Sequence, residues 1–292
     1  MALTGEGLRA RCARELDRSP RGFLRSAWLH EAFLAVPREH FVPDRVWWPA
    51  PGRDGRYALL DRAERPRAWL KAVYLPGAAL ITQIDDGAVA PTGPATGRFT
   101  SSISSPGVVV ELLRHLAPEP GDKVLEIGTG TGYTTALLAH RVGAARVVTV
   151  EIDPRLATRA EGRLRALGRA VRVVRGDGEP GHAPGAPYDR IVATASVRRV
   201  PPAWLAQLAP GGTLVAPLDT PYGHDLLVRL TGDGRGAATG RAVAPVEFMR
   251  LRGQRAPRPY GSLGWPPEAE AADWETLRVS VDGDGQRVRV GD

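Results

Sequence analysis

Cysteine, methionine and lysine are scarce in this chain, and long apolar runs are missing. Of the 292 residues, one is cysteine and two are methionine. A single thiol, Cys12, cannot form an internal disulfide or a cysteine-ligated metal site, so we predict neither a disulfide nor a metal site. The first residues do not resemble a secretion signal, and no apolar segment is long enough to span a bilayer. We therefore expect a cytoplasmic protein.

Arginine supplies nearly all of the positive charge. The chain has 39 Lys and Arg residues against 32 Asp and Glu, a net charge of +7, and lysine occurs only at Lys71 and Lys123. Such an excess can attract nucleic acid, because clustered cations release counterions from phosphates. The arginines are scattered, and their one cluster, residues 9–25, contains a single aromatic residue, Phe23, and no series of interleaved stacking residues, so we interpret it as a solvated helix face. We expect neither a nucleic-acid nor a membrane partner.

The N-terminal third is less regular than the rest. Apolar residues recur at helical spacing over residues 7–34 with a break at Ser19-Pro20, which predicts two helices. Residues 49–98 are rich in Gly, Pro and Asp, and we predict a β-rich flap with extended segments at 67–74 and 78–84.

Strand and helix patterns alternate from residue 108 onward. The predicted strands are 123–127, 147–152, 171–174, 190–194 and 213–217, and the predicted helices are 108–116, 133–142, 154–167 and 202–208. This alternation predicts a parallel sheet with helices on both faces, a doubly wound, Rossmann-like α/β fold. Residues 226–230 and 242–248 would add an antiparallel pair at one edge and complete a seven-stranded sheet. Beyond a Pro-rich stretch, residues 277–290 resemble a hairpin that turns at residues 282–285.

A glycine-rich turn, Gly128-Thr129-Gly130-Thr131-Gly132-Tyr133, joins the first strand of this core to the next helix. Glycine reaches backbone angles closed to other residues, and its missing side chain lets a ligand contact the main chain. A dinucleotide fingerprint requires glycine at position 133, which is tyrosine here, so a pyrophosphate ligand is disfavoured.

Acidic residues beside this turn indicate a nucleoside cofactor. Glu151 ends the following strand, where a carboxylate accepts hydrogen bonds from ribose hydroxyls. Glu126 suits the cationic amino group of a methionine moiety, and Asp177 is placed for the adenine amino group, although an ordinary Gly-Asp-Gly turn also explains it. We predict S-adenosylmethionine as the cofactor. The residues assigned to it are Glu126, Gly128, Thr129, Gly130, Gly132, Tyr133, Glu151, Ile152, Asp177 and Gly178.

Further motifs occur in a fixed order around the glycine-rich turn. They are Val36-Pro37-Arg38 with Phe41-Val42-Pro43, Ser102-Ile103-Ser104-Ser105-Pro106, Gly176-Asp177-Gly178, Pro187-Tyr188-Asp189 and Leu208-Ala209-Pro210-Gly211-Gly212. In this order they resemble the protein-L-isoaspartate O-methyltransferase family over roughly residues 30–250. The resemblance implies methylation of a carboxylate and an active-site serine at Ser104, with Ser102 where the family usually has threonine.

The resemblance also places an acceptor loop at residues 99–105, enlarged and rich in hydroxyls. A carboxylate of pKa near 4 is already nucleophilic at neutral pH, so such an enzyme needs alignment rather than a general base. Hydroxyl and backbone N–H donors can align the carboxylate with the sulfonium methyl. The candidate catalytic residues are Thr100, Ser101, Ser102, Ser104 and Ser105. For Ser105, capping of the following helix is an equal alternative.

The class of methyl acceptor is inferred from a motif that the chain lacks and from its differences from the resembled family. The strand that ends at Thr194 lacks the Asn/Asp-Pro-Pro-Tyr motif that binds an amine, which favours an O-methyl acceptor over a nucleobase. The enlarged acceptor loop and the tail beyond about residue 250 look similar to a subgroup that tailors ribosomally made peptides such as lanthipeptides, lasso peptides and graspetides. In that subgroup an aspartyl methyl ester collapses to aspartimide and then isoaspartate.

We prefer the tailoring function, with a peptide or protein bearing an Asp or isoAsp carboxylate as substrate. The alternatives are general isoaspartate repair, O-methylation of a small molecule, and a non-catalytic nucleoside-binding interaction protein. The predicted domains are an N-terminal helical segment (1–48), the flap with the acceptor loop (49–105), an S-adenosylmethionine-binding core (106–250) and a C-terminal extension (251–292) that holds substrate. We expect a monomer.

Overall fold

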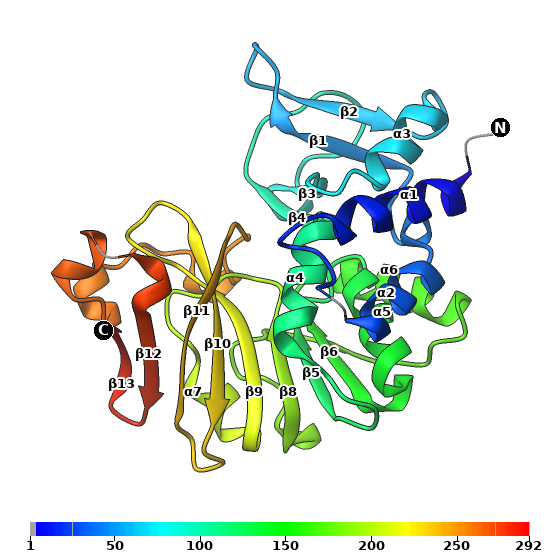
Figure 1. The fold of residues 1–292 in the computed structure, drawn as a ribbon. Coiled ribbons are helices and arrows are strands. Elements are labelled where there is room, and N and C mark those ends of the chain that lie inside the picture. Colours follow the sequence, from blue (N-terminus) through cyan, green and yellow to red (C-terminus); the bar gives the residue numbers. More distant parts are fainter. Residues whose placement is uncertain (1–3, 25, 272, 292) are drawn as a thin grey trace. The chain divides into compact units, whose positions relative to one another are not determined.

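The computed structural model describes residues 4–24, 26–271 and 273–291, which form two compact units (Figure 1). Unit 1 comprises Met1–Arg114, Gly130–Arg141 and Thr158–Arg169, and unit 2 comprises His115–Thr129, Val142–Ala157 and Ala170–Asp292. The four domains proposed from the sequence stay a prediction.

Unit 2 contains a mixed sheet of nine strands in the order β13-β12-β11-β10-β9-β8-β5-β6-β7. The parallel strands are β5 (Val124–Ile127), β6 (Val147–Glu151), β7 (Arg172–Arg175), β8 (Tyr188–Ala193) and β9 (Leu208–Leu218). The antiparallel strands are β10 (Asp225–Gly232), β11 (Ala238–Val246), β12 (Leu277–Asp282) and β13 (Gly285–Val290). Every residue of β5 and β6 is buried, as expected for inner strands of a parallel sheet.

The sheet is larger than the seven strands predicted. The hairpin predicted at residues 277–290 is confirmed, but β12 pairs with β11 and extends the same sheet. Leu277, Val279 and Val281 therefore belong to the hydrophobic core that also contains Leu125 and Ile127. The pair β10–β11 consequently lies inside the sheet instead of at its edge.

The helices of the predicted core are confirmed within about two residues at their ends, the agreement expected of boundary assignments. They are α4 (Pro106–Leu116), α5 (Tyr133–Val142), α6 (Pro154–Ala166) and α7 (Pro202–Ala206). Asp153 caps α6, because its Oδ1 accepts hydrogen bonds from the backbone N–H groups of Arg155 and Leu156 at 2.8 and 3.1 Å.

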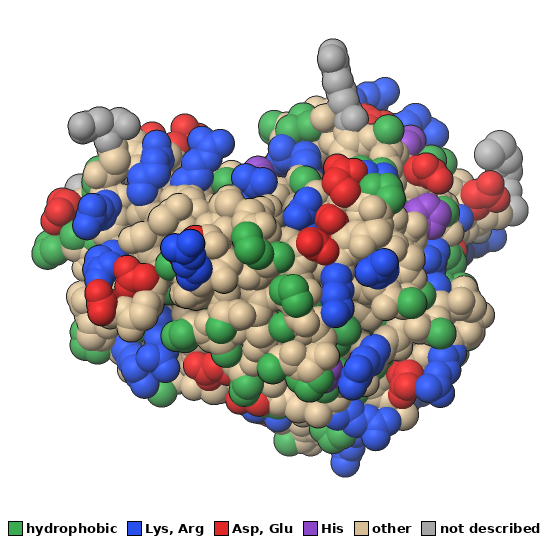
Figure 2. Space-filling view, turned by 90° about the horizontal axis from the view of Figure 1, so that it is seen from below, with side chains coloured by type: hydrophobic (Ala, Val, Ile, Leu, Met, Phe, Trp, Pro, Cys, Tyr) green, Lys and Arg blue, Asp and Glu red, His purple; other side chains and the backbone are tan. Residues whose placement is uncertain are grey.

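Unit 1 begins with the two predicted helices, α1 (Gly5–Asp17) and α2 (Ala27–Ala35). In the predicted arginine cluster, Arg11, Arg14, Arg18 and Arg21 are exposed, as expected of a solvated face, whereas Arg9 is half-buried. Arg25, the last arginine of that cluster, lies outside the described residues. On the face shown in Figure 2, Lys and Arg side chains are interspersed with acidic and apolar ones.

The flap of unit 1 is a four-stranded antiparallel sheet in the order β2-β1-β3-β4. Its strands are β1 (Arg45–Pro51), β2 (Tyr57–Asp61), β3 (Leu80–Ile84) and β4 (Phe99–Ile103). The extended segment predicted at 67–74 is wrong: α3 (Pro66–Val73) is a helix with proline in its first turn and Trp69, Ala72 and Val73 buried. The acceptor loop is also corrected, because residues 99–103 form a strand paired with β3.

Short 3-10 helices connect these elements. They are Arg38–His40, Asp85–Gly87, Ala144–Arg146, Ala183–Gly185, Arg252–Gln254, Tyr260–Leu263, Pro267–Ala271 and Trp274–Thr276. None of the helices within the described ranges combines the length and the apolar character that a membrane crossing requires.

Candidate active site

The glycine-rich loop leaves β5 at Gly128 and enters α5 at Tyr133. Gly128, Gly130 and Gly132 have φ values of +96°, +54° and +90°, which side chains rarely tolerate. In unit 2, a Cβ on Gly128 would lie 2.5 Å from Thr194 Oγ1. The alternating glycines are therefore required by the backbone itself, and one of them also by close contact.

Hydrogen bonds in unit 2 fix the start of this loop. Gly128 N–H donates to the carbonyl of Val150 at 2.9 Å, and the hydroxyls of Thr129 and Thr149 lie 2.7 Å apart. Thr194, which directly follows β8, donates its hydroxyl to the carbonyls of Ile127 and Gly128. The ends of β5, β6 and β8 thus hold the loop from three sides.

Two buried carboxylates lie on adjacent strands, near the carboxyl ends of those strands. Glu126 on β5 is fully buried, and Glu151, the last residue of β6, is 7% exposed. Glu151 Oε1 accepts a hydrogen bond from Asp153 N at 3.0 Å, which fixes the orientation of the carboxylate. Half-buried Ile152 follows directly.

The segment after β7 approaches this edge as well. A Cβ on Gly178 would lie 2.5 Å from Ile127 Cγ2, so the backbone of Gly178 packs directly against the Ile127 side chain. Asp177 is exposed, and its Oδ1 accepts a hydrogen bond from Glu179 N at 3.0 Å. This hydrogen bond belongs to the ordinary Gly-Asp-Gly turn, which was the alternative to an adenine-binding role for Asp177.

Within unit 1, the predicted acceptor hydroxyls divide into two groups. Thr100 Oγ1 donates to Gln83 Oε1 at 3.0 Å, and buried Ser101 accepts from Thr82 at 2.8 Å. Ser105 Oγ accepts a hydrogen bond from Val108 N at 3.4 Å and so caps α4. These three hydroxyls are engaged inside the unit.

Ser102 and Ser104 form the second group, and both are half-buried. The hydroxyl of Ser104 forms no hydrogen bond with another residue in the described part of the chain. The carbonyl of Ser102 lies 3.8 Å from the position of a Cβ on Gly130, so unit 1 itself brings this strand beside the glycine-rich loop.

Arg38 holds the backbone at Ser104, within residues 99–105, which we call the acceptor segment; the sequence did not reveal this role. Its side chain is fully buried; Nε donates to the carbonyl of Val73 at 2.8 Å and Nη2 donates to the carbonyl of Ser104 at 2.7 Å. The guanidinium carbon lies 5.0 Å from the ring centroid of Tyr133. Burial lowers the pKa of Arg38. In the sequence, the only sign of its importance was the Val36-Pro37-Arg38 motif.

Tyr133 is a packing residue of unit 1. Its ring contacts Phe41 at a centroid distance of 5.8 Å, and burial raises the pKa of its hydroxyl. That hydroxyl has no hydrogen-bond partner among the described residues. The predicted role of Tyr133 in cofactor binding stays a prediction, as do the other residue roles.

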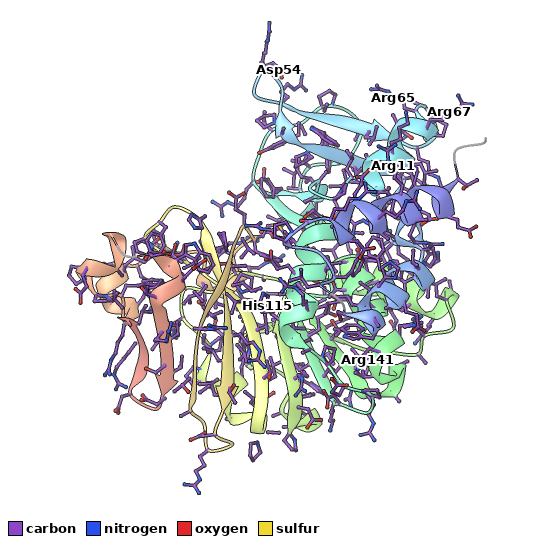
Figure 3. All side chains as sticks on the ribbon, in the orientation of Figure 1. Arg11, Asp54, Arg65, Arg67, His115 and Arg141 are labelled. Carbon is purple, nitrogen blue, oxygen red and sulfur yellow. The ribbon has the colours of Figure 1, made fainter. Side chains whose placement is uncertain are left out.

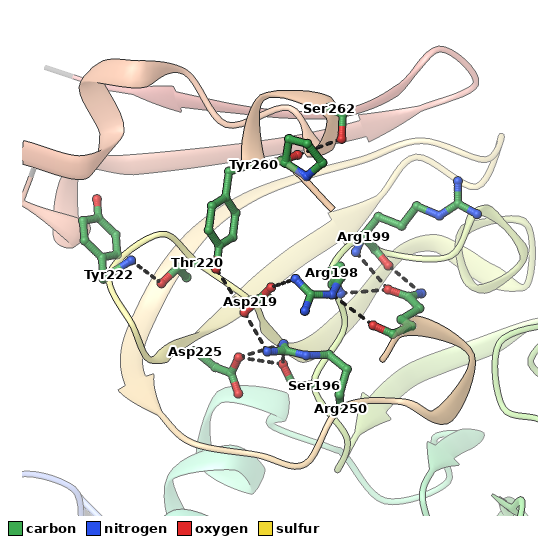
Figure 4. Close-up of polar contacts among 12 residues, drawn as sticks. Ser196, Arg198, Arg199, Asp219, Thr220, Tyr222, Asp225, Arg250, Tyr260 and Ser262 are labelled. Atoms are coloured by element: carbon green, nitrogen blue, oxygen red, sulfur yellow. Dashed lines mark hydrogen bonds and ion pairs between the residues drawn. The ribbon is translucent and has the colours of Figure 1, made fainter. Parts of the chain in front are cut away.

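An ion-pair network of buried aspartates and half-buried arginines, which was not predicted, follows β8 and β9 in unit 2 (Figure 4). Asp219 pairs with Arg198 and Arg250, each at 2.6 Å, and Arg250 also pairs with Asp225 at 3.0 Å. Tyr260, from the C-terminal extension, reaches Asp219 at 3.5 Å. The network therefore ties the extension to the carboxyl ends of these strands.

A glycine-rich loop after the first parallel strand, with an acidic residue ending the second, defines a Rossmann-like S-adenosylmethionine-dependent methyltransferase. Residues 79–256 match the family model of the protein-L-isoaspartate(D-aspartate) O-methyltransferases. The chain belongs to this family. The predicted enzyme class, a carboxyl methyltransferase that uses S-adenosylmethionine, is confirmed.

Curated relatives agree. The chain is 34% identical over 242 residues to a protein-L-isoaspartate O-methyltransferase of Ignicoccus hospitalis, which covers 82% of this chain and 96% of the relative. It is 38% identical over 218 residues to one of Methylorubrum extorquens, covering 74% and 93%.

Solved structures confirm the fold class. A protein-L-isoaspartate O-methyltransferase superposes with a TM-score of 0.67 at 18% identity and covers 97% of this chain and 100% of its own. A putative enzyme of the same type from Plasmodium falciparum, in complex with S-adenosyl-L-homocysteine, has a TM-score of 0.60 at 16% identity and covers 86% and 99%.

Proposed function

We propose that this protein transfers the methyl group of S-adenosylmethionine to the free carboxylate of an isoaspartyl residue in a polypeptide. The observation that carries the proposal is the similarity to relatives named protein-L-isoaspartate O-methyltransferase, which extends over almost their whole length. Two structural observations support the proposal. Buried Arg38 holds the backbone of Ser104, the predicted active-site serine, and the glycine-rich loop has left-handed glycines.

The residues at the edge of unit 2 fit the cofactor chemically. The carboxylate of Glu151 suits two ribose hydroxyls, and the buried carboxylate of Glu126 suits a cationic amino group. The left-handed glycines leave backbone exposed to a flat ligand. When bound, S-adenosylmethionine supplies an electrophilic methyl group on a sulfonium.

The residues of the acceptor segment would align the substrate. An isoaspartyl carboxylate is ionised at neutral pH and is itself the nucleophile, so no residue has to remove a proton. The hydroxyl of Ser104 can donate a hydrogen bond to one carboxylate oxygen and leave the other oriented for attack. Fixing the Ser104 backbone through Arg38 lowers the entropy that such alignment would otherwise lose.

The finer alternative is peptide tailoring, in which an aspartyl side chain is methylated and the ester collapses to aspartimide. The hydroxyl-rich β4 strand supports it, but Thr100, Ser101 and Ser105 are engaged within unit 1. The C-terminal extension does not favour it, because a solved structure named for isoaspartate methylation covers 97% of this chain. Isoaspartate is therefore the better-supported acceptor.

Two matched peptides test the acceptor, one with isoaspartate and one with aspartate at the same position. We expect the native enzyme to methylate the isoaspartyl peptide in the presence of S-adenosylmethionine, as detected by mass spectrometry. Methylation followed by loss of water from the aspartyl peptide alone, or from a cyclised precursor peptide alone, would establish tailoring instead. No methylation of any of these peptides would refute both proposals.

Calorimetric titration of S-adenosylmethionine tests the cofactor site separately. Glu151→Gln keeps the shape of the side chain and removes its charge, so the Kd should rise about ten- to a hundred-fold. Exposed Glu268 provides the matched control, and Glu268→Gln should leave the Kd unchanged. Equal Kd values for Glu151→Gln and the native protein would remove Glu151 from the site.

A further inference from the structure

A cavity of about 370 Å³ lies in unit 1 between α3 and the β1–β2 hairpin. Its walls are apolar, and they include Trp48, Leu59, Leu60, Ala68, Ala72 and Leu75. Leu75, which lines the cavity, is 43% exposed, so part of the apolar wall is open to solvent. This size lies at the lower end of ligand pockets, about 300–1,000 Å³, and suits individual side chains of an extended peptide.

Two cations complete the lining of this pocket. Arg65 and Lys71 are exposed, and neither side chain forms an ion pair or a hydrogen bond with any other residue of the described ranges. Arg67, in α3 with Lys71, is exposed as well; Figure 3 shows Arg67 and Arg65, the residue before α3, at this helix. Because neither Arg65 nor Lys71 is paired with a described carboxylate, the pocket attracts carboxylates.

The pocket is connected to the acceptor segment inside unit 1. Ala72 lines the pocket, and the carbonyl of the next residue, Val73, accepts a hydrogen bond from Arg38. The same guanidinium donates to the carbonyl of Ser104. The end of α3 and the acceptor serine therefore share one buried side chain, which makes the pocket a neighbour of the acceptor segment.

We propose that this pocket binds a segment of the polypeptide substrate that carries an apolar side chain next to a carboxylate, at a distance along the chain from the methylated residue. The inference rests on the proposed function, because it assumes a polypeptide acceptor. The apolar side chain fills the cavity, and the carboxylate pairs with Arg65 and Lys71. The pocket thereby selects among polypeptides that carry the same acceptor group.

Direct binding tests the pocket without any methyl transfer. The probe is a fluorescein-labelled peptide with alternating leucine and glutamate and no isoaspartate, followed by fluorescence anisotropy on the full chain. Ala68→Phe fills the cavity and keeps the cations, whereas Lys71→Glu reverses a charge and keeps the cavity. Each should raise the Kd about three- to ten-fold. Arg53→Glu, an exposed charge reversal at the β1–β2 turn, is the matched control and should bind as the native protein does.

Steady-state kinetics then connect the pocket to turnover. An isoaspartyl peptide extended by the same leucine and glutamate segment should have a lower KM than the unextended peptide, and Ala68→Phe should abolish this difference without changing kcat. Equal probe affinity in the native, Ala68→Phe and Lys71→Glu proteins would overturn the proposal, whether or not isoaspartate is methylated. So would self-association through this face in sedimentation, or binding to anionic phosphatidylserine vesicles in place of the peptide. Failure of methylation with intact probe binding would instead refute the proposed function.

Discussion

The Nη2 atom of Arg38 donates a hydrogen bond of 2.7 Å to the carbonyl oxygen of Ser104. The same guanidinium donates from Nε to the carbonyl of Val73. Its third nitrogen, Nη1, is buried without a partner among the described residues. A single buried cation therefore fixes the backbone of Ser104, whose hydroxyl forms no hydrogen bond with another described residue.

Replacing Arg38 should damage both stability and turnover. Arg38→Met leaves two buried carbonyls without donors, and each such loss destabilises by about 1–3 kcal/mol. We expect a lower free energy of unfolding in urea and a lower kcat for the isoaspartyl peptide. Arg38→Lys keeps the charge and at least one donor, so it should recover part of both losses. An Arg38→Met protein with native stability and native kcat would contradict this assignment.

The glycines of the loop should differ in their tolerance of alanine. Gly130→Ala meets no atom closer than 3.8 Å, so its cost is that of a positive φ, about 1–2 kcal/mol. Gly128→Ala should cost more, because the new Cβ collides with Thr194 Oγ1. Thr194→Ala removes that atom, and the double variant should lose less stability in urea than the sum of its single changes. Additive losses would show that this contact is not the cause.

Adjacent serines should separate structure from chemistry. Ser105→Ala removes the cap of α4 and should lower the free energy of unfolding by about 0.5 kcal/mol, at the low end for caps because its hydrogen bond is long, with little effect on kcat. Ser104→Ala should lower kcat with almost no effect on stability. Urea denaturation and initial-rate kinetics on both variants measure the two effects. The reverse pattern would exchange the two roles.

Acid should weaken the flap of unit 1 through Asp61. The backbone N–H of Ala63 and then the side chain of Arg45 hold the pKa of Asp61 below its ordinary value. A carboxylate with a depressed folded pKa stabilises the protein above its unfolded pKa, near 4, and loses this contribution as the pH falls through the folded pKa. Asp61→Asn should therefore be less stable than the native protein at pH 7, and the difference in urea midpoint should shrink below about pH 4. A difference independent of pH would exclude Asp61 as its source.

The parallel core was predictable because its signals are local. A buried strand such as β6 is a short apolar run. The start of α6 is marked by Asp153, a capping residue directly before the first residue of the helix. The flap was harder to predict, because α3 has eight residues, fewer than the roughly 11–18 residues over which a helical period is assessed. Strand β1 contains Pro49 and Pro51, which the sequence alone indicates as loop.

The site divides in the same way. The positions of the glycine-rich loop and of Glu151 at strand ends could be predicted, because strand ends and turns are indicated by consecutive residues. The role of Arg38 could not, since its hydrogen bonds join residues 35 and 66 positions apart. The engagement of Thr100 and Ser101 depends on the pairing of β3 with β4, which no local pattern reveals.

The large sheet of unit 2 ends in arginine at both margins. The outermost strands are β7, with Arg172 and Arg175, and β13, with Arg287 and Arg289. Charged side chains on an outer strand discourage another molecule from adding a strand of its own. Removing the last hairpin would uncover β11, which then becomes a template for aggregation, so shortened forms of this enzyme should precipitate more readily than the full chain.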